Sequence, residues 1–408
     1  MTEAMAHRID HPLVSDRVQN FPESVIRSMS IVAARHGAIN LGQGFPDFDP
    51  PQEVLDAAKQ AIDDGYNQYA VTWGAPALRE AIAAKMSSFN GIEADADRNI
   101  VVTCGATEAM MASLLATVDP GDRVVIFEPF YENFGPDAVV SGAKPVHVPL
   151  HAPGFQPDEE ALKAAFSEPV KAVIVNTPGN PTGRIFTDGT LRLIADLCTD
   201  HGALAVTDEI YEHMVFDGKR HTSLATVGDM ADRTVTIGGF SKTYSVTGWR
   251  LAYTVADKPV ADAIKRVHDF LTVGAAHPLQ IAGVAALGLP PSYYTWLRDS
   301  YEGKRDLLLG ALEEAGFRCH RPDSAYYIMA DITDFGFPDD TAFSMWLTQE
   351  VGVTCIPGTS FYHHKGQGRQ MVRFAYPKRE ETLRAAADRL ALSREKADEA
   401  AKRPHVRA

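Results

Sequence analysis

Five short apolar runs of the sequence each end in residues that can bind or react with a ligand. NIVVT is followed by CGATEAM, RVVIF by EPFYENF, KAVIV by NTPGNPTG, ALAVT by DEIYEH, and RTVTI by GGFSKTYSVTGWR. In open α/β sheets, ligands bind just beyond the carboxyl ends of the strands. Small residues, an aromatic ring, an Asn, an Asp–Tyr pair and a Lys–Arg pair would therefore meet there. Together they predict a site for one planar, phosphorylated, carbonyl-bearing cofactor.

The first of these segments has the features of an anion site. Gly105, Ala106 and Thr107 fall at a strand-to-helix turn, where small residues let backbone N–H groups approach an anion at the positive end of a helix. An ordinary tight turn is the alternative. The chain has no GxxxxGK[ST] loop, and no GxGxxG follows a strand, which argues against a P-loop nucleotide site and a nicotinamide dehydrogenase.

The later segments carry ionisable side chains. Asp208 directly follows a buried run and precedes Tyr211 by three residues. A buried carboxylate at this point needs a cationic partner, such as a protonated ring nitrogen. The alternative is that Asp208 caps the N-terminus of a helix.

Lys242 lies eight residues before Arg250. Desolvation and nearby cations favour a neutral, nucleophilic lysine, and Arg250 can hold a phosphate with two hydrogen bonds. An exposed loop lysine is the alternative.

Alternating strand and helix patterns must position these residues. Seven β-branched runs begin at residues 99, 123, 144, 171, 203, 233 and 250, and 74–89 and 189–202 have helical spacing. Continuously apolar runs are typical of strands buried on both faces of a parallel sheet. From about residue 292 the pattern changes to long amphipathic helices around a few short strands. We therefore expect an α/β doubly wound domain followed by an α+β domain.

Charge and cysteine content limit the partners and the compartment. The chain has 39 Lys and Arg against 53 Asp and Glu, a net charge of −14, which disfavours nucleic acid and membrane surfaces. Four cysteines without a CxxC pair, and an N-terminus without a secretory signal, favour a cytoplasmic protein. We expect no metal: EIYEH is not HExxH, and His363 and His364 are expected in a solvated loop.

The motifs resemble those of class I (fold type I) aminotransferases that depend on pyridoxal 5′-phosphate. They occur in the family order, within residues 25–392: INLGQGFPDF, NQYAVTWGAPALREAI, VTCGATEAM, EPFYENF, NTPGNPTG, TDEIYEH, GFSKTYSVTGWR and VRFAY. The phrases GQGFPDF, NQY and GATEA are most similar to the branch of kynurenine, glutamine/methionine and N-succinyldiaminopimelate aminotransferases. The resemblance implies a mostly parallel seven-stranded sheet in a large cofactor-binding domain (50–291). A smaller α+β domain (31–49 and 292–392), an N-terminal arm (1–30) and a tail (393–408) complete the expected organisation.

The resemblance also implies the role of each site residue. Lys242 would bind the cofactor covalently and move the proton, Asp208 would keep the pyridine nitrogen protonated, and Tyr211 would hydrogen-bond the ring oxygen. Tyr131 would stack on the ring. Arg373 would grip the substrate carboxylate, assisted by Asn180 and Gly44. The expected cofactor-binding set is Gly105, Ala106, Thr107, Tyr131, Asn180, Asp208, Tyr211, Ser241, Lys242, Arg250 and, from the partner subunit of a homodimer, Tyr69.

The resemblance implies transfer of an amino group from an L-amino acid to a 2-oxo acid by a ping-pong mechanism. A C–S β-lyase on the same scaffold, or an aspartate or N-succinyldiaminopimelate aminotransferase, is the alternative. A cofactor-binding transcriptional regulator is disfavoured by the acidic charge and the short arm. Thr107 stands where some acidic-substrate relatives have Lys, and Phe45, Phe48 and Trp73 are candidates for an apolar wall. We therefore expect methionine, glutamine, aromatic or kynurenine-like donors.

Three residues depart from the family pattern. Gly239 stands where Ser is usual, and Ala252 and Ser324 stand where Gly is common. With Gly239, one hydroxyl to the phosphate is missing, so we expect Gly239→Ser to tighten cofactor binding.

Overall fold

A computed structural model describes residues 11, 13–19, 21 and 23–402, except for the side chain of Lys365. Its centre is an eight-stranded sheet of order β2-β9-β8-β7-β6-β3-β4-β5. The strands are β2 (Ile100–Thr103), β3 (Arg123–Glu128), β4 (Lys144–His151), β5 (Gln156–Pro157), β6 (Ala172–Asn176), β7 (Leu204–Asp208), β8 (Thr234–Gly239) and β9 (Ala252–Val255).

This sheet confirms the expected mostly parallel α/β class. The pairs β4–β3, β3–β6, β6–β7 and β7–β8 are parallel, whereas β9 runs antiparallel to both β2 and β8. The seven predicted runs all form strands. The eighth strand, β5, was not predicted, because its two residues pair with the end of β4 without an apolar pattern of their own.

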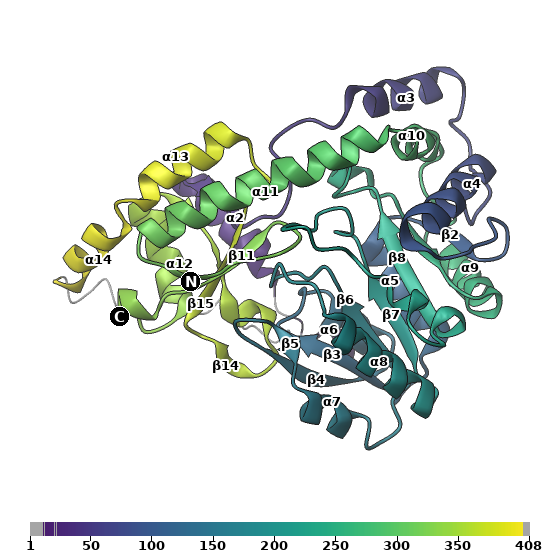
Figure 1. Ribbon diagram of the computed structural model, residues 1–408, viewed down its shortest axis with the longest axis horizontal. Coiled ribbons are helices and arrows are strands. Elements are labelled where there is room, and N and C mark those ends of the chain that lie inside the picture. Colours follow the sequence, from purple (N-terminus) through teal and green to yellow (C-terminus); the bar gives the residue numbers. More distant parts are fainter. Residues whose placement is uncertain (1–10, 12, 20, 22, 403–408) are drawn as a thin grey trace.

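Helices cover both faces of the sheet because both faces are apolar (Figure 1). Successive strand side chains point to opposite faces. In β3, Val124 and Ile126 pack with α5, α6 and α9, whereas Val125 and Phe127 pack with α7 and α8. The helices are α3 (Gln52–Asp63), α4 (Pro76–Lys85), α5 (Ala106–Thr117), α6 (Phe134–Val140), α7 (Glu159–Ala165), α8 (Asp188–His201), α9 (Lys258–Thr272) and α10 (His277–Leu287).

A second unit is built mainly from the C-terminal part of the chain. Its antiparallel sheet has the order β10-β11-β15-β13. Its strands are β10 (Arg318–His320), β11 (Tyr327–Asp331), β12 (Val353–Thr354), β13 (Ile356–Pro357), β14 (Lys365–Gly368) and β15 (Met371–Ala375). Its helices are α11 (Pro291–Glu314), α12 (Asp340–Trp346), α13 (Glu380–Leu390) and α14 (Ser393–Ala401).

The N-terminal part of the chain also joins this second unit. Strand β1 (Ile39–Asn40) pairs in parallel with β12, Ile39 opposite Val353. Helix α2 (Val25–His36) continues across residue 30, where the arm was expected to end, and α1 (Asp16–Gln19) precedes it. Figure 1 shows α2 beside the yellow-green C-terminal elements, with α11 extending from there toward α10. The division into domains stays a prediction.

The ends of the chain lie only partly within the described residues. Residues 393–401 of the expected tail form α14, whereas 403–408 and most of residues 1–12 lie outside the described part. Within the described ranges, no helix combines the length and the apolar character needed to cross a membrane.

Candidate active site

One cavity of about 580 Å³ lies where β6 and β7 end and where the chain leaves β8. Helix α2, the segment 43–45 and β15 line it from the other side. It brings together eleven of the thirteen predicted site residues: Gly44, Ala106, Thr107, Tyr131, Asn180, Asp208, Tyr211, Ser241, Lys242, Arg250 and Arg373. The two others do not line the cavity. Gly105 is the chain neighbour of Ala106, the first lining residue of α5, and Tyr69 lies elsewhere.

Lys242 is a half-buried amine in this cavity. Its Nζ donates a hydrogen bond to the Gly44 carbonyl oxygen at 3.2 Å. Burial lowers the pKa of Lys242 to about 8, against the opposing charge of Asp208 and with the help of Arg250 and Arg373. The side chain is therefore no exposed loop lysine, and a larger share of it is a neutral nucleophile near neutral pH.

Asp208 is the last residue of β7, and a turn rather than a helix follows it, so it is not a helix N-cap. Its Oδ1 accepts a hydrogen bond from the backbone N–H of Ile210 at 3.2 Å. Burial raises the pKa of Asp208 to about 6, although Ile210 and Lys242 act in the opposite direction. A cation beside this carboxylate, such as a protonated ring nitrogen, would stabilise its charged form.

Two tyrosines lie next to this pair. The Oη atoms of Tyr211 and Tyr327 are 2.8 Å apart, and both rings are buried. Burial raises the pKa of Tyr211 well above its ordinary value. The phenol therefore stays protonated and can donate a hydrogen bond to an oxygen of a ligand.

The turn before α5 and Arg250 form a cradle that suits a phosphate group. Gly105 is the N-cap residue of α5, with a φ of +86°, and a Cβ there would lie 2.4 Å from Arg250 Nη2. Only a glycine lets the guanidinium come so close to the helix N-terminus. With the buried Ser241, these groups supply N–H and O–H donors and positive charge, as a phosphate requires.

A contact between the Glu108 carboxylate and the His268 imidazole lies next to this turn. Glu108 accepts a hydrogen bond from the Cys104 backbone N–H at 2.5 Å, and its other oxygen lies 2.6 Å from His268 Nδ1. His268 Nε2 lies 3.0 Å from the Thr72 carbonyl oxygen. The contact thus ties the turn before α5 to α9 and to the loop that follows Tyr69.

The Arg373 guanidinium can form two parallel hydrogen bonds to a carboxylate, like the prongs of a fork. Its Nη1 donates to Asn180 Oδ1 at 2.7 Å and its Nη2 to the Gly42 carbonyl oxygen at 2.6 Å, while the guanidinium lies 4.4 Å from the Tyr327 ring centroid. Its buried Nε has no hydrogen-bond partner among the described residues. A buried cation with a free donor is suited to bind an anionic substrate.

Sequence reasoning missed the part of the cavity that α2 lines. Ile26, Arg27 and Ile31 belong to the lining, and only the amphipathic spacing of this segment hinted at a role. Of the expected apolar wall, Phe45 lines the cavity, whereas Phe48 packs against Tyr301. Trp73 also lies outside the lining, with the Lys265 ammonium 5.4 Å from its ring centroid.

Asp137 of α6 is a further cavity residue that the sequence did not single out. Its side chain is buried, and its Oδ2 has no hydrogen-bond partner in the described part of the chain. Burial raises the pKa of Asp137 to about 7.

The paired histidines lie in a loop, as expected, but they are not merely solvated. His364 Nδ1 contacts a carboxylate oxygen of the fully buried Glu128, whose other oxygen accepts the His363 backbone N–H at 2.9 Å. The His363 ring stacks on His147 with centroids 4.2 Å apart. Burial lowers the pKa of His147 to about 4.

Tyr69 does not line the cavity of its own chain. Its side chain is 84% exposed, and Phe270, which is 92% exposed, is another large apolar side chain left open to solvent. The loop that carries Tyr69 is held by His277 Nδ1, 3.1 Å from the Gln68 carbonyl oxygen.

Comparison with known proteins agrees with this geometry. Residues 36–390 match the model of the family "Aminotransferase class I and II". The chain is 36% identical to the methionine aminotransferase of Escherichia coli, over 93% of this chain and 99% of that protein. It is 37% identical to a probable N-succinyldiaminopimelate aminotransferase of Mycobacterium tuberculosis, over 93% and 98%. The solved structure of the N-succinyldiaminopimelate aminotransferase from M. tuberculosis superposes with a TM-score of 0.90, at 37% identity, and covers 93% of this chain and 100% of that one.

The chain therefore belongs to the class I and II aminotransferases. It is a pyridoxal-phosphate-dependent transaminase of fold type I that moves an amino group from an amino acid to a 2-oxo acid. These relatives are named for transamination, which does not favour the C–S β-lyase alternative.

Proposed function

We propose that Lys242 is the cofactor-binding and proton-transferring lysine of this transaminase. When bound, pyridoxal phosphate supplies a conjugated ring that withdraws the electrons left on the substrate Cα. The Lys242 amine would take up the proton from the substrate Cα and deliver it to the aldehyde-derived carbon of the cofactor. Burial favours the neutral form of this amine, which a base requires.

The other cavity residues hold the cofactor and the substrate. Asp208 keeps the proton on the ring nitrogen, Tyr211 and Asn180 donate hydrogen bonds to the ring oxygen, and Tyr131 covers the ring. Arg250, Ser241 and the N–H groups of Gly105, Ala106 and Thr107 bind the phosphate. Arg373 binds the substrate carboxylate with Asn180 and the Gly44 backbone nearby.

The observation that carries these roles is the meeting of Lys242, Asp208 and Arg373 in one cavity, beside a phosphate cradle. The test is spectroscopic. Adding an amino acid to the purified holoenzyme should convert its absorbance to that of the amino form of the cofactor, and a 2-oxo acid should reverse the change. Lys242→Ala should abolish turnover. An unchanged spectrum with every standard amino acid would contradict the proposal.

We further propose a preference for donors with apolar or neutral side chains, such as methionine, glutamine, aromatic amino acids or kynurenine. Ile26, Ile31 and Phe45 of the cavity lining support this preference, as does similarity to the methionine aminotransferase. Arg27 is a cation in the same lining. A kcat/KM for aspartate above those for methionine and phenylalanine would overturn the preference, and Arg27→Gln would then test whether this cation binds the acidic side chain.

We also propose a cytoplasmic homodimer in which Tyr69 reaches the partner's phosphate site. The exposure of Tyr69 and Phe270 supports an apolar interface, and four free thiols suit a reducing compartment. Mixing Tyr69→Phe subunits with Lys242→Ala subunits tests the shared site. Each mixed dimer has one site with both lesions and one with neither, so activity should recover. No recovery in verified heterodimers would contradict a shared site.

A further inference from the structure

A buried polar network lies behind Asp208 and Tyr211. Within the segment 208–213, Asp208 and Tyr211 line the cavity, whereas Glu209 and Glu212 bind polar groups elsewhere. Glu209 accepts hydrogen bonds from Thr207 Oγ1 at 3.0 Å and from Ser223 Oγ at 2.6 Å, and one of its oxygens lies 2.7 Å from His221 Nε2.

Glu212 belongs to the same network. Its Oε1 lies 2.5 Å from Lys85 Nζ, and its Oε2 accepts a hydrogen bond from Asn90 Nδ2 at 2.7 Å. Asn90 Nδ2 also lies 2.9 Å from Ser223 Oγ, which links the two glutamates. Lys85 ends α4, and Asn90 ends the π-helical turn η1 (Met86–Asn90) that continues it. Such turns are frequent at functional sites.

The network is largely shielded from solvent. Glu209 is fully buried, and the side chains of Glu212 and His221 are 5% and 4% exposed. Burial alone would raise the pKa of Glu212, but Lys85, His213 and His221 outweigh it and bring that pKa down to about 2. Glu212 is therefore a carboxylate at every pH at which the enzyme would be assayed.

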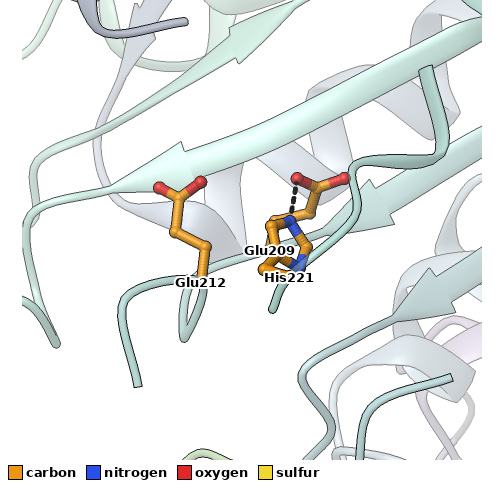
Figure 2. A group of neighbouring side chains, drawn as sticks. All are labelled: Glu209, Glu212 and His221. Atoms are coloured by element: carbon orange, nitrogen blue, oxygen red, sulfur yellow. Dashed lines mark hydrogen bonds and ion pairs between the residues drawn. The ribbon is translucent and has the colours of Figure 1, made fainter. Parts of the chain in front are cut away.

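The three groups Glu209, Glu212 and His221 lie close enough to share a metal ion, with ligand atoms within 4.8 Å of one another. Figure 2 shows that His221 is bound to Glu209, while the Glu212 carboxylate lies to one side. The cation that Glu212 meets is the Lys85 ammonium. Each of the two carboxylates thus already has a partner within the protein, Lys85 for Glu212 and His221 for Glu209.

We propose that Glu209 and Glu212 are positioning residues that fix the orientation of Asp208 and Tyr211 toward the cofactor ring. The inference rests on the proposed roles of Asp208 and Tyr211. Both glutamates are chain neighbours of these residues. Glu209 is anchored to the segment 221–223, and Glu212 is anchored to α4 and η1. Because a displacement below 1 Å is enough to weaken a hydrogen bond to a bound ring, a rigid anchor on the opposite side of the segment sets that geometry.

The test uses the holoenzyme and the Glu212→Gln variant, which keeps the side-chain shape but removes the charge that Lys85 meets. We expect the absorbance of the bound cofactor to titrate at a shifted pH. Cofactor retention on dialysis should fall about tenfold, as for other residues that orient a ligand-binding group. Ser223→Ala, which removes the link between the glutamates with little change in volume, should shift both readouts in the same direction by less.

Asp340→Asn is the matched control. Asp340 is a buried carboxylate of the second unit that accepts hydrogen bonds from the Thr359 N–H and Oγ1, each at 2.7 Å, and it does not line the cavity. This variant should lose thermal stability without shifting the absorbance titration. Unchanged titration and retention in folded Glu212→Gln and Ser223→Ala would overturn the positioning role. If the unaltered protein neither binds the cofactor nor transaminates, the proposed function fails instead.

Discussion

Arg373 Nη1 donates a hydrogen bond to Asn180 Oδ1 across 2.7 Å, and this contact joins β15 of the second unit to the NTPGNPTG segment that follows β6. The guanidinium is held at two of its nitrogens before any substrate arrives. A preorganised fork loses little side-chain entropy when it binds a carboxylate.

Arg373→Lys tests this fork. Lysine keeps the charge but cannot form two parallel hydrogen bonds, so we expect a loss of about 1.5–3 kcal/mol, roughly ten- to a hundredfold in kcat/KM. Steady-state kinetics with the best donor and acceptor would measure it, and cofactor absorbance should remain unchanged. A kcat/KM within twofold of the unaltered enzyme would exclude a substrate-binding role for the fork.

The lowered pKa of Lys242 predicts how cofactor-free enzyme takes up pyridoxal phosphate. Only the neutral amine attacks an aldehyde, and burial places its pKa near 8. The rate of covalent attachment, followed by stopped-flow absorbance, should therefore rise with pH up to about 8 and level off above it. A rate that keeps rising toward pH 10 would show an ordinary, solvent-exposed amine.

The structure argues against our expectation that Gly239→Ser alone tightens cofactor binding. Gly239 of β8 is paired with Ala252 of β9, and a Cβ at residue 239 would lie 3.0 Å from the Ala252 Cβ and 2.8 Å from Ile210 Cδ1. Both positions depart from the family pattern, and the methyl group of Ala252 occupies space that a side chain at 239 would need.

We therefore expect Gly239→Ser to lower thermal stability and cofactor retention, because Ile210 adjoins Tyr211. Gly239→Ser combined with Ala252→Gly should restore both, whereas the two single effects would simply add if the positions were independent. Melting temperature and dialysis of all four proteins complete this double-mutant cycle. A Gly239→Ser protein as stable as the unaltered protein would contradict this prediction, because β8 and β9 would then accommodate the added side chain at little cost in stability.

Asp137 predicts a pH-dependent stability. Its pKa is raised from 3.8 to about 7 in the folded protein, so the folded state binds more protons than the unfolded chain between these values. The free energy of unfolding should therefore fall as pH rises from about 4 to 7. Asp137→Asn should melt higher than the unaltered protein at pH 8 but not at pH 4, and the exposed Asp232→Asn serves as control. An equal difference at both pH values would contradict a buried, uncompensated carboxyl group.

Much of the site was predictable because its residues directly follow predicted strands. Asp208, Asn180 and Lys242 come within a few residues of a strand end, so the sheet alone brings them together. The place of α2 in the cavity was not predictable, because it depends on packing between segments remote in sequence. The compensation between Gly239 and Ala252 depends in the same way on the antiparallel pairing of β8 with β9.

The pairing of Ile39 with Val353 has a consequence for how the enzyme is made. During translation β1 leaves the ribosome well before its partner β12, because all the strands of the large sheet lie between them in the sequence. The adjoining carbonyl groups of Gly42 and Gly44, which meet Arg373 and Lys242, can acquire their final positions only after that. The large sheet can assemble while the chain is growing, but the cavity is completed only after β12 and Arg373 have been synthesised.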